Sequence, residues 1–98
     1  MMHFAKEREM NAYCNFAGIG LIPWGPVAGG HLCRPIGSTS SARLDANKER
    51  PQKFSDSDKA IISRVEEVAK QNNWSMAQVA LAWINDKVAS PIVGFSSV

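Results

Sequence analysis

The stretch Gly18–Arg34 carries the residues of this chain whose types and spacing could take part in chemistry. A short apolar run, Ile19–Pro23, is followed by Trp24 and then by a loop that carries Gly29 and Gly30. A glycine loop that follows a strand can present backbone N–H groups to a ligand, because no side chain blocks the approach. The same residues would also suit an ordinary strand followed by a turn.

Positive charge gathers directly after this stretch. Residues 31–53 contain five cations and two anions, a net charge of +3, whereas the whole chain carries +2. A basic loop beside a glycine loop would suit a phosphate ligand, although solvated loops are also often basic. The net charge of the whole chain is too small to indicate nucleic-acid binding.

Metal binding and membrane insertion are not predicted from the remaining residues. His31 and Cys33 lie two residues apart, but a zinc site takes three or four ligands. Glu66 and Glu67 fall on the polar face of a predicted helix, where carboxylates are usually solvated. The two cysteines form no CxxC motif and suit a reduced, cytoplasmic protein. No apolar run approaches the roughly 20 residues that a membrane span requires.

The elements before and within the stretch are predicted from its periodicity. Residues Phe4–Ala17 predict a helix, with Gly18 as its C-terminal cap. The run Ile19–Pro23 is bounded by glycine and proline, which favours a buried parallel strand. The segment Gly25–Phe54 has no clear period, and a loop of that length is usually functional or disordered. The apolar face of the first helix consists of Met10, Tyr13, Cys14 and Ala17.

The second half of the chain predicts two capped helices and a second strand. Ser55 and Ser75 each begin a helix with a capping box. The run Ile92–Phe95 then predicts a strand that pairs in parallel with Ile19–Pro23, because strand, crossover and strand form a right-handed parallel unit. We expect the helices between Ser55 and Lys87 to pack on one side of this pair. The predicted buried positions are Ile61, Ile62, Val65, Val68 and Ala69 in the first helix and Met76, Val79, Ala80, Trp83 and Ile84 in the second.

The order helix, strand, loop, helix, helix, strand indicates an α/β chain with an incomplete sheet. Parallel sheets need helices on both faces and more than two strands. The first predicted helix has no strand before it, and the chain stops at the end of a strand. We therefore expect a piece of a larger fold that is poorly stable by itself, because its strand edges are unpaired and its core is small.

Three segments resemble the C-terminal part of an aldo-keto reductase, closest to the aryl-alcohol-dehydrogenase-like branch. They are REMNAYCNFAGIGLIPWGPVAGG, WSMAQVALAWI and VASPIVGFSSV, in the right order and at the right spacing. The resemblance covers nearly the whole chain and is weakest over Gly37–Gln52. It implies that residues 1–98 are one partial domain, the C-terminal portion of a (β/α)8 TIM barrel of about 250 residues or more. The runs Ile19–Pro23 and Ile92–Phe95 would be its seventh and eighth strands, two parallel strands with about three helices.

The resemblance implies NADP(H) as the cofactor and places part of its site in the loops after these two strands. Trp24 matches the aromatic residue that stacks on the nicotinamide ring, and Gly25 replaces a serine whose hydroxyl meets the pyrophosphate. Ser96 is the expected hydroxyl donor to the ribose phosphate. The other matching residues are Pro26, Val27, Ala28, Gly29 and Gly30 after the first strand and Gly94, Phe95 and Ser97 after the second.

No catalytic residue is expected within the chain itself. The family uses an aspartate, a tyrosine, a lysine and a histidine on earlier strands, and Tyr13 is the one tyrosine here, on the first helix. Reduction of aldehydes or ketones by hydride transfer, and the small carbonyl substrate, would then belong to a complete barrel. Two alternatives stay open. One is a stand-alone non-catalytic chain, a truncated or pseudogene product or a piece that joins another barrel fragment. The other is an unrelated small α/β binding module.

Overall fold

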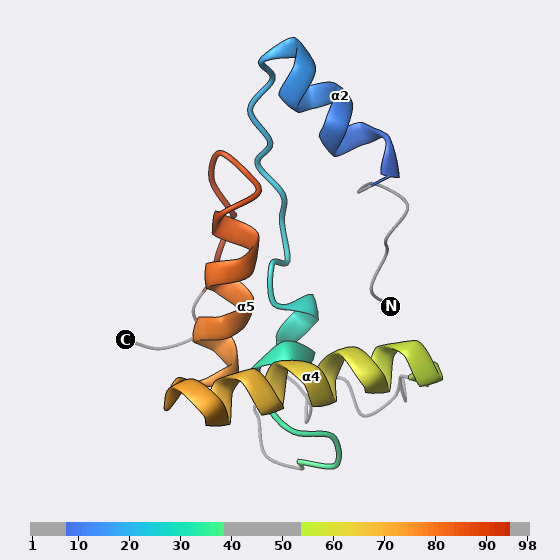
Figure 1. The fold of residues 1–98 in the computed structure, drawn as a ribbon, viewed down its shortest axis with the longest axis vertical. Coiled ribbons are helices and arrows are strands. Elements are labelled where there is room, and N and C mark those ends of the chain that lie inside the picture. Colours follow the sequence, from blue (N-terminus) through green and yellow to red (C-terminus); the bar gives the residue numbers. More distant parts are fainter. Residues whose placement is uncertain (1–7, 39–53, 95–98) are drawn as a thin grey trace.

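The computed structural model describes residues 8–38 and 54–94. In chain order its elements are α2 (Met10–Ala17), the 3-10 helix η1 (Ala28–Cys33), α4 (Asp56–Asn72) and α5 (Met76–Asn85). Figure 1 shows that α4 and α5 cross, with η1 lying against them, while α2 stands at the other end of an extended segment. Half of the predicted loop Gly25–Phe54, residues 39–53, lies outside the described residues, and so do Phe95, Ser96 and Ser97.

Both capping boxes form as predicted. At the start of α4, the Ser55 hydroxyl accepts from the Asp58 amide and the Asp58 carboxylate accepts from the Ser55 amide, each at 3.1 Å. At the start of α5, the Gln78 side chain accepts from the Ser75 amide at 2.8 Å, and the Ser75 hydroxyl accepts from the Gln78 amide at 3.2 Å. Asn73 adopts the left-handed conformation that ends α4, with φ of 56°. Local sequence therefore determines where both helices begin and where α4 ends.

The core of the described residues is small and lies where α4, α5 and η1 meet. Ile62, Ala69 and Met76 form its centre, and Ala80 is also buried. These four positions belong to the predicted apolar stripes, which are confirmed there. The partly buried side chains that pack against the centre are Leu32, Phe54, Val65 and Val79.

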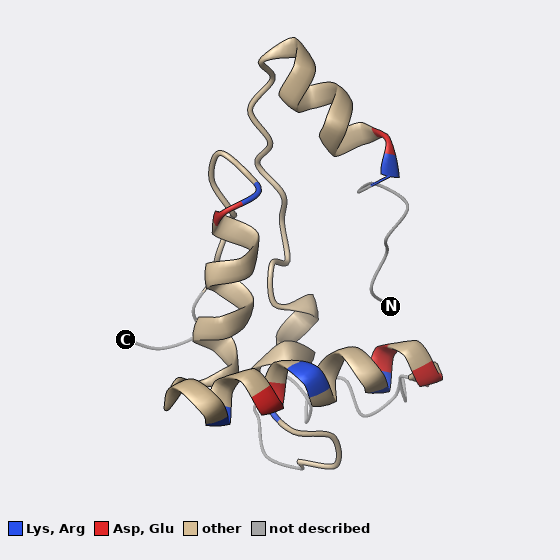
Figure 2. Ribbon diagram, in the orientation of Figure 1, with Lys and Arg blue, Asp and Glu red and all other residues tan. Residues whose placement is uncertain are grey.

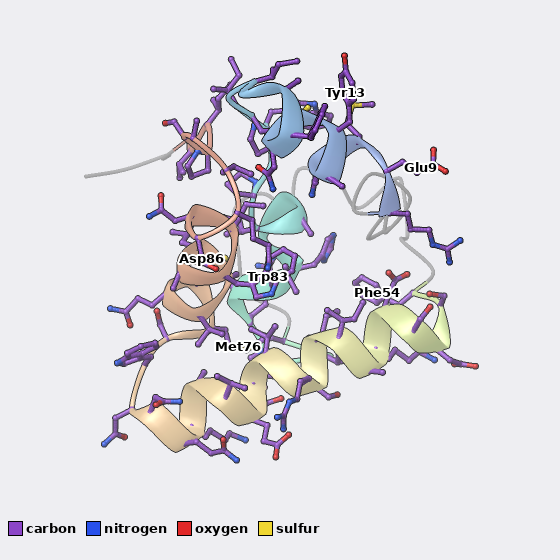
Figure 3. All side chains as sticks on the ribbon, turned by 45° about the horizontal axis from the view of Figure 1, so that its top comes forward. Glu9, Tyr13, Phe54, Met76, Trp83 and Asp86 are labelled. Atoms are coloured by element: carbon purple, nitrogen blue, oxygen red, sulfur yellow. The ribbon has the colours of Figure 1, made fainter. Side chains whose placement is uncertain are left out.

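Trp83 is a correction to the predicted core. It is 52% exposed, and the Lys87 ammonium group lies 5.0 Å from the centre of its ring. Among the described elements, α5 contacts α4 and η1, so the side of the helix that carries Trp83 has no neighbour to bury it. Figure 3 shows Trp83 on α5 and Met76 at the turn where α5 meets α4.

The two runs point in the same direction, as predicted, but their register differs from the prediction: the first run lies beside residues 89–92, and the second run meets it only at Ile92. A single parallel bridge joins Trp24 to Ile92. The Pro23 carbonyl accepts from the Ile92 amide at 2.8 Å, and the Leu21 carbonyl accepts from the Ala89 amide at 3.0 Å. The parallel pairing thus rests on a few hydrogen bonds along one edge of the first run.

The assignment of these runs as strands is corrected for the described residues. Neither Ile19–Pro23 nor the described part of Ile92–Phe95 forms a strand there; the pairing is an isolated bridge. Two paired segments without further neighbours are only marginally stable, because the outer edge of each pairs with no other strand. Within the described residues the regular elements are therefore all helices. None of these helices is long and apolar enough to cross a membrane.

The helix α2 makes few contacts with the rest of the molecule. Its predicted start at Phe4 lies outside the described residues, but the predicted cap is confirmed: Gly18 has φ of 68°, and the Ile19 amide donates to the Cys14 carbonyl at 2.8 Å. Of its predicted apolar face, Cys14 alone is buried, at 5% exposed, whereas Tyr13 is 64% exposed. Within the described residues, packing therefore covers this face at Cys14 and leaves Met10 and Tyr13 exposed.

Candidate functional site

The parallel bridge pairs Trp24, the residue after the first run, with Ile92, the first residue of the second run, and the chain leaves both residues in the same direction. Trp24 lies opposite Ile92, so the loop that begins at Gly25 leaves beside the loop that contains Gly94. Ligands of parallel α/β folds bind at the carboxyl ends of the strands, where such loops converge. The structure thus brings Trp24 beside Ile92, two residues before Gly94, whereas Phe95, Ser96 and Ser97 lie outside the described residues.

Trp24 presents its ring at this end of the pair. Its backbone is held by the bridge to Ile92, yet its side chain is 86% exposed. An indole in water leaves a large apolar area unburied. A flat ring that stacked on Trp24 would bury part of that area, which is favourable. The position therefore offers an exposed aromatic surface on a held backbone to a ligand.

The loop after Trp24 turns through a series of left-handed residues. Gly25, Gly29 and Gly30 have φ of 64°, 66° and 94°, and Ala28 has φ of 52°. Ala28 bears a strain of about 1–2 kcal/mol that glycine escapes. A Cβ atom on Gly25 would meet nothing within 4 Å, so glycine is needed here for its backbone conformation, and it leaves the outer face of the loop open.

Some amides of this loop are already used within it. The Ala28 amide donates to the Gly25 carbonyl and the Gly30 amide to the Val27 carbonyl, each at 3.0 Å. The Leu32 amide also donates to Val27, at 3.2 Å. These three N–H groups cannot serve a phosphate while the loop keeps this conformation. The prediction that the loop presents backbone N–H groups is therefore limited to its remaining amides, and a cationic side chain would have to supply the charge for an anion.

Arg34 supplies that charge. A Cβ atom on Gly30 would lie 3.2 Å from Nη2 of Arg34, so the guanidinium group packs over the glycine loop. From the sequence Arg34 was counted in the basic segment and not singled out. No sequence pattern signals this contact, because Gly29 and Gly30 are non-helical and Arg34 is extended. A cavity of about 130 Å³ adjoins it, lined by His31, Arg34, Ile36, Phe54 and their neighbours.

Two residues near Arg34 in the sequence, His31 and Cys33, are described by their packing and burial. The His31 ring packs edge-on against Phe54, with ring centres 4.9 Å apart. Burial raises the pKa of the Cys33 thiol, and the Arg34 guanidinium opposes that rise. Cys33 is thus a protonated thiol at neutral pH, although it is accessible to solvent. Nowhere in residues 8–38 and 54–94 do three His, Cys, Asp or Glu side chains gather as a metal site requires.

The larger cavity lies away from this site. It has a volume of about 360 Å³ and separates the end of α2 from the turn after α5, between residues 14–21 and 86–89. It is the gap left where α2 lacks packing partners. Tyr13 also lies apart from the site, on α2, where its side chain projects from the molecule (Figure 3).

Comparison with known proteins shows one family over the whole chain. The profile of the Aldo/keto reductase family matches residues 1–98. An aldo-keto reductase of Fusarium vanettenii is 45% identical over 102 residues, which cover 100% of this chain and 27% of the relative.

Two further relatives carry names of oxidoreductases. A putative aryl-alcohol dehydrogenase of Schizosaccharomyces pombe is 44% identical over 108 residues, covering 100% of this chain and 31% of the relative. The versiconal hemiacetal acetate reductase of Aspergillus parasiticus is 46% identical over 97 residues, covering 94% of this chain and 28% of the relative. The chain therefore spans about a quarter to a third of the length of these relatives.

Proposed function

Because the chain belongs to the aldo-keto reductase family, we propose that it is a C-terminal, NADP(H)-binding segment of an enzyme that reduces aldehydes or ketones. Residues 1–98 would form one partial domain of a (β/α)8 barrel. The observation that carries the proposal is the parallel bridge between Trp24 and Ile92, because the chain leaves both residues in the same direction, toward the strand ends where such barrels bind phosphate groups.

The described residues fit the cofactor in shape and in charge. The exposed Trp24 ring would lie against the nicotinamide, which supplies a hydride when bound. The open glycine loop would lie along the pyrophosphate, and Arg34 beside Gly30 would hold its charge through N–H donors. From the second loop, Ser96 and Ser97 would donate hydroxyl hydrogen bonds to the ribose phosphate.

The substrate we propose is a small carbonyl compound. The names of the relatives describe a hemiacetal acetate reductase and a putative aryl-alcohol dehydrogenase, which indicates carbonyl–alcohol chemistry in this branch. Aryl aldehydes are the class to test first. Both cysteines are free thiols in the structure, which supports a reduced compartment such as the cytoplasm.

By itself the chain should reduce no carbonyl at a measurable rate. An alkoxide that forms by hydride transfer needs a positioned acid, and loss of general acid catalysis alone costs about 10²–10⁴-fold. Tyr13 is the one tyrosine of the sequence, and it lies on α2, where its side chain projects from the molecule. This is the observation that favours the second candidate, a non-catalytic chain, for the 98 residues acting alone.

A chimera tests the proposal directly. The 98 residues replace the matched segment of the Fusarium vanettenii aldo-keto reductase, and NADPH oxidation is followed with a panel of aryl aldehydes. We expect turnover in the chimera and none with the isolated chain. Arg34→Gln should raise the KM for NADPH roughly tenfold, whereas Arg64→Gln on α4 should leave it unchanged. A chimera that folds and binds no NADPH contradicts the proposal.

A further inference from the structure

The smaller cavity lies between the segment after η1 and the first half of α4. It has a volume of about 130 Å³, and residues 31 and 34–38 line it on one side and Phe54 and Ile62 on the other. In Figure 1 the segment after η1 passes below α4, which η1 itself contacts. We call this space the Phe54 cavity.

Most of the wall of the Phe54 cavity is apolar. Ile62 is 1% exposed and belongs to the centre of the core, against which Phe54 packs. The His31 ring meets Phe54 edge-on, and Pro35 and Ile36 complete the apolar part of the wall. An apolar cavity of about 150 Å³ in a protein interior holds one benzene molecule. The Phe54 cavity is therefore of the size that one six-membered ring occupies.

The backbone on one side of the cavity is held in a turn. The Ser38 amide donates to the Pro35 carbonyl at 3.3 Å, and Gly37 has φ of 85°. The ring contact between His31 and Phe54 joins this side to the residue that precedes Ser55 at the start of α4. A wall that is already ordered lowers the entropy cost of binding a ligand.

Arg34 brings a positive charge to the cavity wall, and no carboxylate neutralises it within residues 8–38 and 54–94. Its half-buried side chain forms no ion pair or hydrogen bond there. By contrast, the cations of α4 pair with carboxylates of the same helix, whose blue and red residues lie together in Figure 2. Residues 34–38 include no Asp or Glu. The N–H donors of a guanidinium group match the two oxygens of a carboxylate.

We propose that the Phe54 cavity binds a small aromatic carboxylate, with its ring against Phe54 and Ile36 and its carboxylate at the Arg34 guanidinium. Inorganic phosphate would leave the apolar walls uncovered, and an uncharged ring would leave Arg34 without a counter-ion. Arg34 is also the cation of the proposed cofactor site. The carboxylate site does not require NADPH, because its ring pocket lies between the segment after η1 and α4.

The test is titration of the 98-residue chain with 4-fluorobenzoate, followed by fluorine NMR without NADPH, at a temperature where circular dichroism shows folded helices. We expect saturable binding with a Kd of about 1 mM, as suits a ligand of this size. Arg34→Gln should weaken it roughly tenfold, whereas Arg64→Gln, at an exposed ion pair of α4, should leave it unchanged. 4-Fluorobenzamide has the same ring without the charge and should bind at least about tenfold more weakly.

Ile36 supplies a matched pair of variants. Its side chain lines the cavity and is 45% exposed, so a polar side chain there leaves the core intact. Ile36→Asp puts a carboxylate beside the bound one, whereas Ile36→Asn has nearly the same shape without the charge. We expect 4-fluorobenzoate to bind Ile36→Asp roughly tenfold more weakly than Ile36→Asn. Unchanged far-UV circular dichroism of each variant shows that its fold is intact.

The remaining outcomes overturn the inference or separate it from the proposed function. No saturable binding up to about 10 mM, tenfold above the expected Kd, overturns it. So does equal binding of 4-fluorobenzamide, or binding that neither Arg34→Gln nor Ile36→Asp weakens. Displacement of 4-fluorobenzoate by an equal concentration of inorganic phosphate also overturns it, because the ring then contributes nothing.

If Arg34→Gln does not fold, the 4-fluorobenzamide comparison on the unchanged chain and the two Ile36 variants decide the question. An active chimera together with a chain that binds no 4-fluorobenzoate contradicts this inference alone. A chain that binds 4-fluorobenzoate, together with a folded chimera that binds no NADPH, supports this inference and contradicts the proposed function.

Discussion

At the residue scale, the site depends on a glycine loop and one arginine. The loop amides of Ala28, Gly30 and Leu32 are bonded within the loop, so Arg34 is the group that brings charge to it. Sequence patterns found the glycines, because their spacing after an apolar run is local. They did not find the contact of Arg34 with Gly30, because the 3-10 turn that creates it has two left-handed glycines inside it.

The pKa of the Cys33 thiol, followed through its reactivity, tests whether the Arg34 guanidinium lies beside it. Burial raises the pKa of the Cys33 thiol and Arg34 lowers it, so Arg34→Met should raise that pKa further. The measurement is the pH dependence of iodoacetamide labelling of the native chain, in which Cys33 is labelled and the buried Cys14 is protected. Arg64→Met, on the exposed face of α4, is the control and should cause no change. A Cys33 pKa that falls or stays constant in Arg34→Met would show that the guanidinium lies elsewhere.

At the element scale, the pairing of the two runs depends on close approach at Gly20. A Cβ atom there would lie 3.2 Å from the Ala89 Cβ, which is tighter than ordinary contact. Gly20→Ala should therefore force the runs apart and destabilise the chain by about 1 kcal/mol. Urea unfolding measures this, with Gly94→Ala as the control, since a Cβ on Gly94 meets nothing within 4 Å. Equal stability of the two variants would contradict the observed pairing.

The start of α5 depends on its capping box. Ser75→Ala removes the acceptor for the Gln78 amide and should lower the free energy of unfolding by about 1 kcal/mol. Ser63→Ala, inside α4 on its exposed side, should be neutral or slightly stabilising because alanine is the better helix former. If Ser63→Ala lowered the helicity of α5 and Ser75→Ala did not, the role of the capping box would be contradicted.

The elements differ in how far sequence could predict them, for a physical reason. Capping boxes and the stripe at Ile62, Ala69 and Met76 follow from residues close in the chain, and they were found. The burial of Trp83 and the extension of the two runs into strands depend on neighbours from other elements. No such neighbour is present among the described residues, so Trp83 is exposed and the pairing is reduced to one bridge.

At the scale of the whole molecule, the isolated chain should be poorly stable. Among the described residues its core centres on Ile62, Ala69 and Met76, which is a small core for a chain of 98 residues. We expect thermal unfolding below about 60 °C, in the lower part of the range of mesophilic domains. Circular dichroism at 222 nm measures it. A cooperative transition above that temperature would mean that the 98 residues form a complete domain.

The central claim is that Trp24 lies against the nicotinamide of NADPH when the barrel is complete. Its most direct test is the tryptophan fluorescence of the chimera as NADPH is added. We predict that NADPH quenches the emission, that Trp24→Ala removes most of this quench, and that Trp74→Ala, at a side chain 53% exposed between α4 and α5, retains it. An undiminished quench in Trp24→Ala, with NADPH still bound, would place the nicotinamide elsewhere and contradict the account.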